Sequence, residues 1–262
     1  DSPQGIVGLG GGIYDPYGVG VLRRADHVIR WALDRSGERC DPSQISALSA
    51  VRHLQVDTVL TGQARAVDWM RSQLLPLLPL SEVRGPAGIY FWPWLIADAR
   101  DATMTLEVGG NATRQGKWRR PRVSGVSRVT IADAHDARSG LPTRRWTVAG
   151  SRRADDPTTE VGLDPWATRA AAVYGERTEE IEAQVICDDA TAQQIARWRL
   201  HAGCRPRLDV DLFTARDARP RPGARVRVID SPQGVDSVAE VMAVRYTGGT
   251  GALVTARIWP RL

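Results

Sequence analysis

The last third of the chain reads as a capped helix followed by four strand-like runs. An extended segment, Tyr174–Gln184, leads to Asp188 and Asp189, which stand where an acidic cap opens a helix that runs to His201. The four runs are Arg207–Phe213, Ala224–Asp230, Val238–Tyr246 and Ala252–Trp259. Short consecutive strands leave backbone edges that must be closed or covered. This part of the chain therefore predicts a sheet whose edges meet another element or another chain.

Length and composition allow a globular protein with a core of ordinary size. The chain has 262 residues, enough for one large domain or two smaller ones, and 42% of them are hydrophobic. No apolar run approaches the roughly 18 residues that a membrane span needs. The sequence starts at Asp1 with neither a methionine nor a signal-like segment, which predicts a processed or truncated chain.

The chain is basic, with a formal net charge of +5 and a sequence pI near 9.5. Lys117 is the only lysine, so arginine supplies 34 of the 35 basic residues. These arginines are spread along the chain among 30 acidic residues. Such mixing of signs favours a solvated or subunit-facing surface over a dedicated nucleic-acid site.

The first part of the chain predicts a glycine-rich segment, residues 1–20, and then a small lobe of helices and strands. The expected elements are a helix at Ala25–Arg35, a helix that begins at Asp41, a strand at Leu54–Leu60 and a helix at Gln63–Leu75. Trp31, Trp69 and Leu74 fall on apolar helix faces, so we expect them to be buried.

The most aromatic stretch, Gly88–Leu95, has two interpretations. Tyr90, Trp92 and Trp94 could form a platform that binds carbohydrate or stacks on nucleic-acid bases. Consecutive side chains of a strand point to opposite faces, however, so the aromatics of this stretch cannot all share one face. The pattern therefore favours a buried strand.

A basic run at residues 114–122 surrounds Trp118 and could bind nucleic acid, but a solvated loop or an intersubunit arm is the more common explanation. Beyond it we expect strands at Val126–Asp133 and Arg145–Ala149, and a surface loop at Arg152–Pro165. Side chains of the run and of the later strands are the interaction candidates, because arginines on strand faces can pair with the carboxylates of a neighbouring subunit. These candidates are Trp118, Arg119, Arg120, Arg225, Arg227 and Arg245.

One pentapeptide occurs twice, as Asp1–Gly5 and as Asp230–Gly234. The second copy follows a strand and predicts a turn. The first copy could be the same turn of an earlier barrel.

No residue pattern predicts catalysis, a metal site or a cofactor. Three cysteines, Cys40, Cys187 and Cys204, show no paired spacing, which argues against a disulfide framework and a zinc site. Cys40 with His53 would suit a cell-wall peptidase, but a buried thiol explains Cys40 equally well. Asp133 and Asp136 flank His135 and could bind a metal, although they fall in an expected turn.

Five segments resemble one known family in their order and pattern. They are Arg24–Ser36 followed by Cys40 and Asp41, Gln63–Leu75, Val126–Ile131, Asp189–Arg197 and Pro222–Val228. In the tail hub and baseplate hub proteins of phages, similar segments form two helices of an α+β lobe, a strand that enters a barrel, a helix inside that barrel and a strand that follows a glycine. The short beginning of this chain departs from that family, because it lacks a complete first barrel.

The resemblance implies an α+β fold, with an antiparallel β-barrel domain and an α+β lobe. The implied domains are a glycine-rich segment at 1–20, the lobe at 21–124 and a barrel domain with one inserted helix at 125–262. The implied role is a structural virion component without catalysis. It forms a homotrimer or ring in the tail, assembled in the host cytoplasm, and meets tube, distal tail, and spike or fibre proteins. The ring supports host attachment, and DNA passes transiently through its lumen.

Two other functions remain open from the sequence: a tail-associated hydrolase of cell wall or capsule, and a carbohydrate-binding module. A hydrolase requires a pocket with titratable groups of perturbed pKa. A binding module requires exposed aromatic side chains in one plane. A hub requires open strand edges and more exposed apolar area than a monomer usually shows.

Overall fold

The computed structural model divides the chain into two compact units, residues 1–93 with 130–147 and 180–198, and residues 94–129 with 148–179 and 199–262. The structure describes residues 22–39, 48, 51–56, 65–85, 88–93, 102–119, 125–135, 139, 141–151, 159–162, 164–186, 188–215, 220–247 and 251–258. None of the helices within these ranges is long and apolar enough to cross a membrane.

The lobe near the start of the chain combines short helices with one hairpin. Its elements are α1 (Ala25–Arg35), α3 (Ala66–Trp69), a π-helical turn (Met70–Leu74), a 3₁₀ turn (Leu75–Leu77), β1 (Leu80–Gly85) and β2 (Gly88–Pro93). Helix α1 is confirmed at the predicted bounds, with its predicted apolar face buried. Leu74 is buried as expected, whereas Trp31 and Trp69 are only half-buried. Of the second expected helix the structure describes Leu48 alone, which is helical and buried as expected, and most of the strand Leu54–Leu60 lies outside the described residues.

The third expected helix does not continue as one α-helix to Leu75. It changes from α to π geometry at Met70 and ends in the 3₁₀ turn. Pro76 lacks the N–H that would bond the carbonyl of Ser72, so the α-helical ladder cannot continue through it. Periodicity in the sequence shows the apolar face but not this change of winding.

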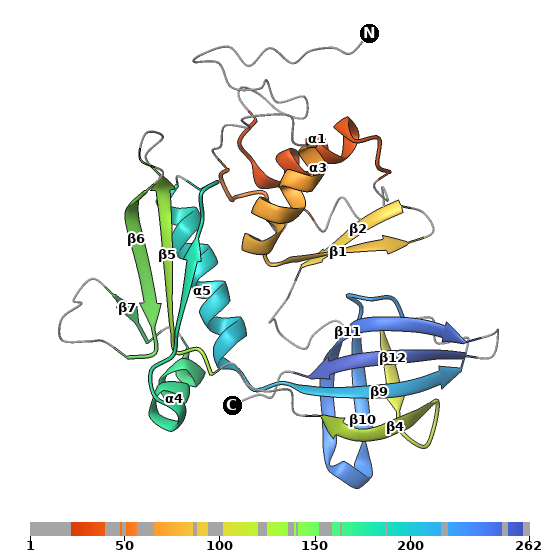
Figure 1. Ribbon diagram of the computed structural model, residues 1–262. Helices are drawn as coiled ribbons and strands as arrows, with labels where there is room; N and C mark the ends of the chain where they lie inside the picture. Colours follow the sequence, from red (N-terminus) through yellow and green to blue (C-terminus); the bar gives the residue numbers. More distant parts are fainter. Residues whose placement is uncertain are drawn as a thin grey trace. The chain divides into compact units, whose positions relative to one another are not determined.

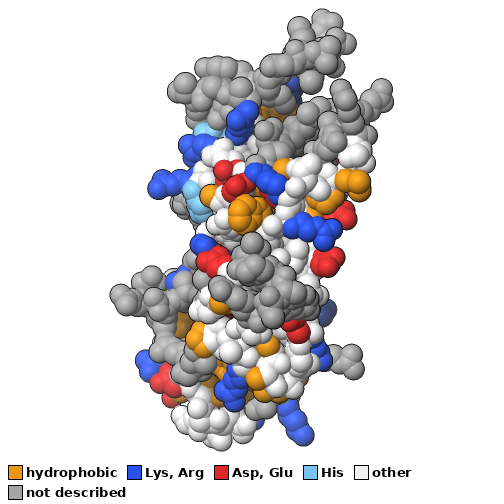
Figure 2. Space-filling model, turned by 90° about the vertical axis from the view of Figure 1, so that its left-hand side faces the viewer, with side chains coloured by type: hydrophobic (Ala, Val, Ile, Leu, Met, Phe, Trp, Pro, Cys, Tyr) orange, Lys and Arg blue, Asp and Glu red, His pale blue; other side chains and the backbone are white. Residues whose placement is uncertain are grey.

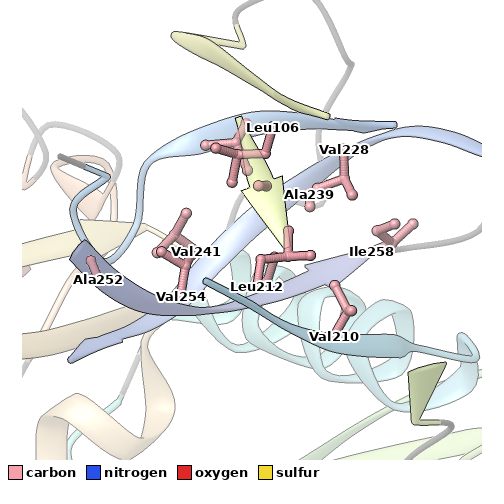
Figure 3. Packing of buried hydrophobic residues seen from close by; sticks show 12 residues of the cluster. Leu106, Val210, Leu212, Val228, Ala239, Val241, Ala252, Val254 and Ile258 are labelled. Carbon is pink, nitrogen blue, oxygen red and sulfur yellow. The ribbon is translucent and has the colours of Figure 1, made fainter. Parts of the chain in front are cut away.

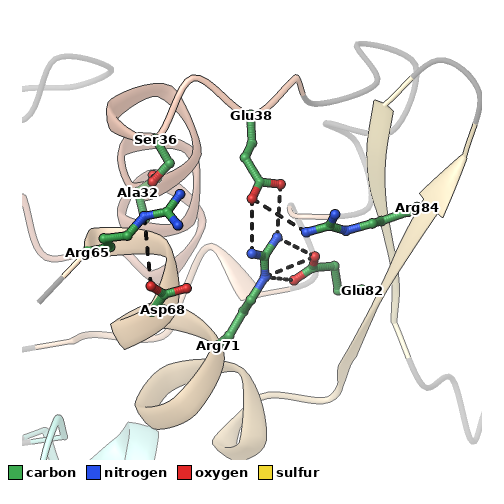
Figure 4. A network of polar contacts seen from close by, with 8 residues as sticks. All are labelled: Ala32, Ser36, Glu38, Arg65, Asp68, Arg71, Glu82 and Arg84. Atoms are coloured by element: carbon green, nitrogen blue, oxygen red, sulfur yellow. Dashed lines mark hydrogen bonds and ion pairs between the residues drawn. The ribbon is translucent and has the colours of Figure 1, made fainter.

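Arg71, in the π-helical turn, joins three parts of the lobe (Figure 4). Its guanidinium donates to both carboxylate oxygens of Glu38, at 3.0 Å each, and to both of Glu82 on β1, at 2.6–3.1 Å. Arg84 approaches Glu38 from the same strand at 3.5 Å. The hydrogen bonds from Arg71 hold the pKa of Glu38 below its usual value.

A six-stranded sheet dominates the second unit, in the order β3-β10-β11-β12-β9-β4. Its strands are β3 (Met104–Glu107), β4 (Ala112–Arg119), β9 (Leu208–Ala215), β10 (Arg225–Asp230), β11 (Val235–Thr247) and β12 (Gly251–Ile258). The last four confirm the strand-like runs of the sequence to within a few residues. In Figure 1 the sheet bends strongly, and register shifts in β4 and in β11 increase local twist.

Strands β3 and β4 lie at opposite edges of this sheet although only residues 108–111 separate them in sequence. Such a short turn forces the sheet to curl until its two edges approach one another. Asn111 holds the turn by accepting from the Glu107 N–H and donating to the Thr105 carbonyl, both at 2.8 Å. The protein is therefore mixed α and β as predicted. Among the described residues its main sheet is a curled half-barrel. These strands do not show the closed antiparallel barrel that the resemblance implies, and β3 runs parallel to β10.

Asp230 fastens the open side of the half-barrel. This carboxylate lies at the end of β10, is buried, and accepts hydrogen bonds from Arg114 at 2.8 Å and from the Trp118 indole at 2.9 Å. Both donors belong to β4, one edge strand of the sheet, whereas β10 is the neighbour of the other edge strand, β3. The contact thus crosses the gap between the two edges.

The interior of the half-barrel is a continuous apolar cluster (Figure 3). Strand β10 shows how the sequence builds it: Val226 and Val228 are buried while Arg227 faces solvent, in the alternation that the sequence predicts. The cluster consists of Leu106, Ala112, Val210, Leu212, Val226, Val228, Ala239, Val241, Ala252, Val254, Ala256 and Ile258. The second copy of the repeated pentapeptide, Asp230–Gly234, forms the predicted turn, with Gly234 in the left-handed region. The first copy lies outside the described residues.

Between β4 and β9 the chain forms a four-stranded sheet in the order β7-β6-β5-β8 and two helices. These elements are β5 (Arg128–His135), β6 (Pro142–Ala149), β7 (Glu160–Val161), α4 (Pro165–Tyr174), β8 (Thr178–Glu182) and α5 (Asp189–Cys204). The boundary expected at residue 125 does not coincide with the half-barrel, which takes β3 and β4 from before it and four strands from after it. Helix α4 forms where no helix is predicted from the sequence.

Removal of the Asp230 carboxylate is expected to destabilise the half-barrel. In Asp230→Ala, Arg114 and the Trp118 indole lose a buried acceptor, which costs about 3–5 kcal/mol of the free energy of unfolding. Asp236→Ala is the matched control, because that carboxylate is exposed on β11 and solvent screens its pair with Arg227, so its loss should change the free energy of unfolding little. Urea unfolding measures both variants. Equal losses in the two would contradict the role given to Asp230.

Low pH is expected to lower the stability of the lobe, because Glu38 becomes protonated. Because its pKa is lower in the folded than in the unfolded chain, the stabilisation is complete above the unfolded value of about 4.3 and is lost as pH falls through the folded value. Glu38→Gln should therefore flatten the decline of unfolding free energy between about pH 5 and pH 3. The exposed Glu180→Gln serves as control, and an unchanged pH profile in Glu38→Gln would refute the link.

Candidate functional site

Asp164 organises a group of titratable side chains in the second unit. It precedes α4, is 3% exposed, and caps the helix by accepting the Trp166 N–H at 2.9 Å. Its other oxygen accepts from His201 Nδ1 and from Arg205 Nε, the latter at 3.2 Å. The carboxylate therefore joins the beginning of α4 to the end of α5.

Opposing effects act on the pKa of Asp164. Burial alone would raise it, but the hydrogen bonds from His201 and the Trp166 N–H, together with the charge of Arg205, bring it below the ordinary value. Asp164 is thus a carboxylate at neutral pH. An ionised acceptor is what a helix N-terminus and two basic side chains require.

Cys204, His201 and Asp164 superficially resemble a nucleophile, a base and an orienting acid. The thiol of Cys204 donates to the backbone carbonyl of His201 at 3.6 Å, and the ring Nδ1 of His201 is engaged with Asp164. Burial, followed by the nearby charge of Asp164, raises the pKa of the Cys204 thiol to about 12. A thiol that stays protonated is a poor nucleophile, so the geometry favours a structural role for the trio.

A cavity of about 180 Å³ adjoins this cluster. Trp166, Arg169, Ala170, Val173 and Tyr174 of α4 line it together with Cys204 and Pro206. The Arg169 guanidinium lies 5.4 Å from the centre of the Trp166 ring, and that of Arg177 lies 5.6 Å from the centre of the Tyr174 ring. Small-molecule and cofactor sites usually enclose about 300–1,000 Å³, so this cavity is small for them.

The structure distributes the predicted interaction residues over the half-barrel and pairs several of them within the chain. The described part of the basic run expected as a loop or arm, residues 114–119, belongs to strand β4, where Trp118 binds Asp230 and Arg119 binds Asp211 at 2.9 Å. Arg227 forms a two-pronged contact with Asp236, at 2.6 and 2.7 Å.

Two of the remaining candidates lie elsewhere on the sheet and one cannot be placed. Arg225 is half-buried on β10 and Arg245 is exposed on β11, while Arg120 lies outside the described residues. On the face drawn in Figure 2, basic and acidic side chains are interspersed and do not gather by sign. That the six candidate residues form an interaction surface stays a prediction.

Of the positions considered for chemistry, the structure places only some. Cys40 and Asp136 lie outside the described residues, and His53 is exposed with its ring edge-on to Trp198, 6.3 Å between centres. Asp133 is buried and accepts from Arg144 at 2.9 Å, and burial raises its pKa. Within the ranges that the structure describes, no cluster of three potential metal ligands occurs.

The aromatic stretch forms strand β2, whose Phe91 and Trp92 are both buried. Tyr90 is half-buried, and Trp94 lies outside the described residues. Burial of Trp92, at 8% exposure, removes one of the three rings that a carbohydrate platform would use. The strand instead contributes to the core of the lobe, as its consecutive aromatics indicate.

Sequence reasoning overlooked the Asp164 cluster, although one local signal was present. Asp164 followed by Pro165 is a typical start of a helix, with an acidic cap and a proline in the first turn. The partners His201 and Arg205 follow far later in the sequence, so only the fold brings them to this cap.

No protein-family model and no curated protein matches the chain. Among solved structures it is similar to a tail protein from Neisseria meningitidis MC58, with 18% identity, 89% of this chain and 66% of that chain covered, and a TM-score of 0.47. It is also similar to the prophage tail protein gp18 from Listeria monocytogenes EGD-e, with 14% identity, coverage of 77% and 55%, and a TM-score of 0.42.

A chain from the virion of a native gene transfer agent particle is similar as well, with 15% identity and a TM-score of 0.49. The match covers 90% of this chain and 47% of that one. This chain therefore spans about half to two thirds of the length of the structures it resembles. Two of these three are tail proteins, and the third is a virion component.

Cys204 is expected to resist alkylation in the folded chain. Its pKa of about 12, against about 8.5 for a free cysteine, lowers the thiolate fraction more than a hundredfold at pH 7.5. Iodoacetamide labelling of a Cys40→Ser, Cys187→Ser variant, followed by mass spectrometry, measures the rate with and without urea. Equal rates in the folded and unfolded chains would show that the thiol is accessible and ionisable.

Proposed function

We propose that this chain is a structural component of a phage tail or tail-derived particle, where it acts as a tail hub or baseplate hub protein. The observation that carries the proposal is the half-barrel with two terminal strands, β3 and β4. Each of these strands has a single ladder partner among the described strands. Backbone donors and acceptors along such edges favour pairing with further chains.

The order of elements supports the same role. A helical lobe precedes two strands of the half-barrel, an α/β segment follows, and α5 leads into the last four strands. Helix α1, strand β5, helix α5 and the strand after Gly223 correspond to segments that resemble hub proteins in the sequence. A hub requires this alternation because its sheets form the ring and the other elements connect them.

The rival functions receive less support from the described residues. A hydrolase needs a nucleophile or an acid–base pair open to substrate, whereas Cys204 is protonated and Asp164 serves as a helix cap. A carbohydrate-binding module needs exposed coplanar rings, whereas Trp92 is buried. Assembly explains the chain without an active site.

In the proposed role the half-barrel faces the half-barrels of other copies in a trimer or ring between the tail tube and the tip. Distal tail, spike or fibre proteins are the expected neighbours, and the ring supports host attachment. The arginine-rich composition suits a lumen through which DNA passes with weak, sequence-independent contacts.

Cryo-electron microscopy of the native particle tests this proposal. We expect several copies of the chain in a ring, each burying more than about 1,000 Å² in total against its neighbours through the half-barrel. A solitary copy whose half-barrel faces only solvent would refute the hub role. Hydrolysis of peptidoglycan or capsule by the purified chain would instead support the enzymatic alternative.

A further inference from the structure

We propose that the cavity beside helix α4 is a docking site for an acidic segment of a partner protein, which inserts one apolar side chain into it. The inference goes beyond the tail assignment, since it rests on the cavity and on the charges at its mouth. It applies whether or not the half-barrel assembles into a ring.

The residues of α4 that line the cavity share one face of the helix. Trp166, Arg169, Ala170, Val173 and Tyr174 follow one another at intervals of three, one, three and one, so they form a single stripe along α4. Cys204, at the end of α5, and Pro206, just beyond it, complete the wall of the cavity. The Asp164 cluster fixes the two helices to one another at this end, so the cavity has a rigid base.

The size of the cavity selects the kind of occupant. About 180 Å³ is too small for an ordinary cofactor but comparable with the space that one large apolar side chain fills. Apolar side chains that enter such pockets are typical anchors of protein–protein interfaces. The cavity therefore suits one leucine-sized or aromatic residue of a partner.

The mouth of the cavity exposes apolar surface. Val173 is 61% exposed and Tyr174 is 50% exposed, and they are neighbours on the last turn of α4. Only two other large hydrophobic side chains in the described part of the chain are exposed to this degree, Leu141 and Tyr246. An adjacent pair at the rim of a cavity gives an arriving apolar residue a continuous surface to cover.

The charges around the mouth are positive. Arg169 and Arg177 are exposed beside Trp166 and Tyr174. Two nearby carboxylates have partners within the chain, because Asp164 is buried among three donors and Glu176 accepts from Arg128 at 2.8 Å. A segment with glutamates or aspartates on either side of its apolar anchor complements this arrangement.

The same residues fit a nucleic acid less well. Bases bind proteins without sequence preference by stacking on open aromatic faces. Here a guanidinium lies over a face of Trp166 and another over a face of Tyr174. The cavity beside them is lined by Ala170, Val173 and Pro206, which offer a base no hydrogen-bond partner from their side chains.

Fluorescence anisotropy with the complete 262-residue chain tests the inference. The probe is a labelled peptide, Glu-Glu-Leu-Glu-Glu, and the comparisons are Glu-Glu-Ser-Glu-Glu, Lys-Lys-Leu-Lys-Lys and an oligothymidine of similar length. We expect the first peptide to bind at least tenfold more tightly than the other three. Failure to bind, or equal binding of the serine peptide, the lysine peptide or the oligothymidine, would overturn the proposal.

Two variants locate the binding. Val173→Asp places a carboxylate at the mouth of the cavity, and Arg169→Glu reverses the charge there. Each variant should lower the affinity for the peptide at least tenfold. Arg145→Glu changes an exposed arginine of β6 and is the matched control, expected to change the affinity less than twofold. Because all three residues are surface positions, circular dichroism should show an unchanged fold. Loss of binding in the control, or its persistence in both mouth variants, would place the site elsewhere.

Discussion

The contact between Asp230 and strand β4 is the interaction on which the half-barrel depends. A curled sheet with two separate edges has no ladder to hold those edges together, and a turn at residues 108–111 restrains only one end. The buried carboxylate, with one arginine and one indole as donors, fixes the open side further along β4. Because both donors come from one edge and the acceptor from beside the other edge, curvature of the sheet and burial of its apolar interior are coupled.

The half-barrel is also assembled from distant parts of the sequence. Strand β3 pairs with β10 in the register Met104 to Val226, and β4 pairs with β9 in the register Ala112 to Thr214. Closing such long loops costs conformational entropy before the strands gain contacts. The stabilisation comes mainly from the apolar cluster inside the sheet, to which both early strands contribute through Leu106 and Ala112. We therefore expect this sheet to fold more slowly than the local helices.

Local patterns in the sequence predict local structure well here. Alternation in β10 and the apolar face of α1 follow directly from residue spacing, and the prediction of four consecutive late strands is confirmed. The parallel pairing of β3 with β10, the change to π geometry at Met70 and the partners of Asp164 depend on contacts between distant segments. Trp118 illustrates the limit: its basic neighbours suggest a solvent-facing arm, yet its indole binds a buried carboxylate of the same chain.

The register at the end of β4 has a consequence for how such a chain can change. Arg119, where the chain leaves the half-barrel, lies opposite Asp209, where it returns. The intervening residues 120–207 thus depart from and rejoin neighbouring points on one sheet, the arrangement in which inserted domains are best tolerated. A change in the length of this segment would therefore leave the strand order of the half-barrel unaltered. Sequence changes could therefore accumulate in residues 120–207 while the half-barrel keeps a constant framework.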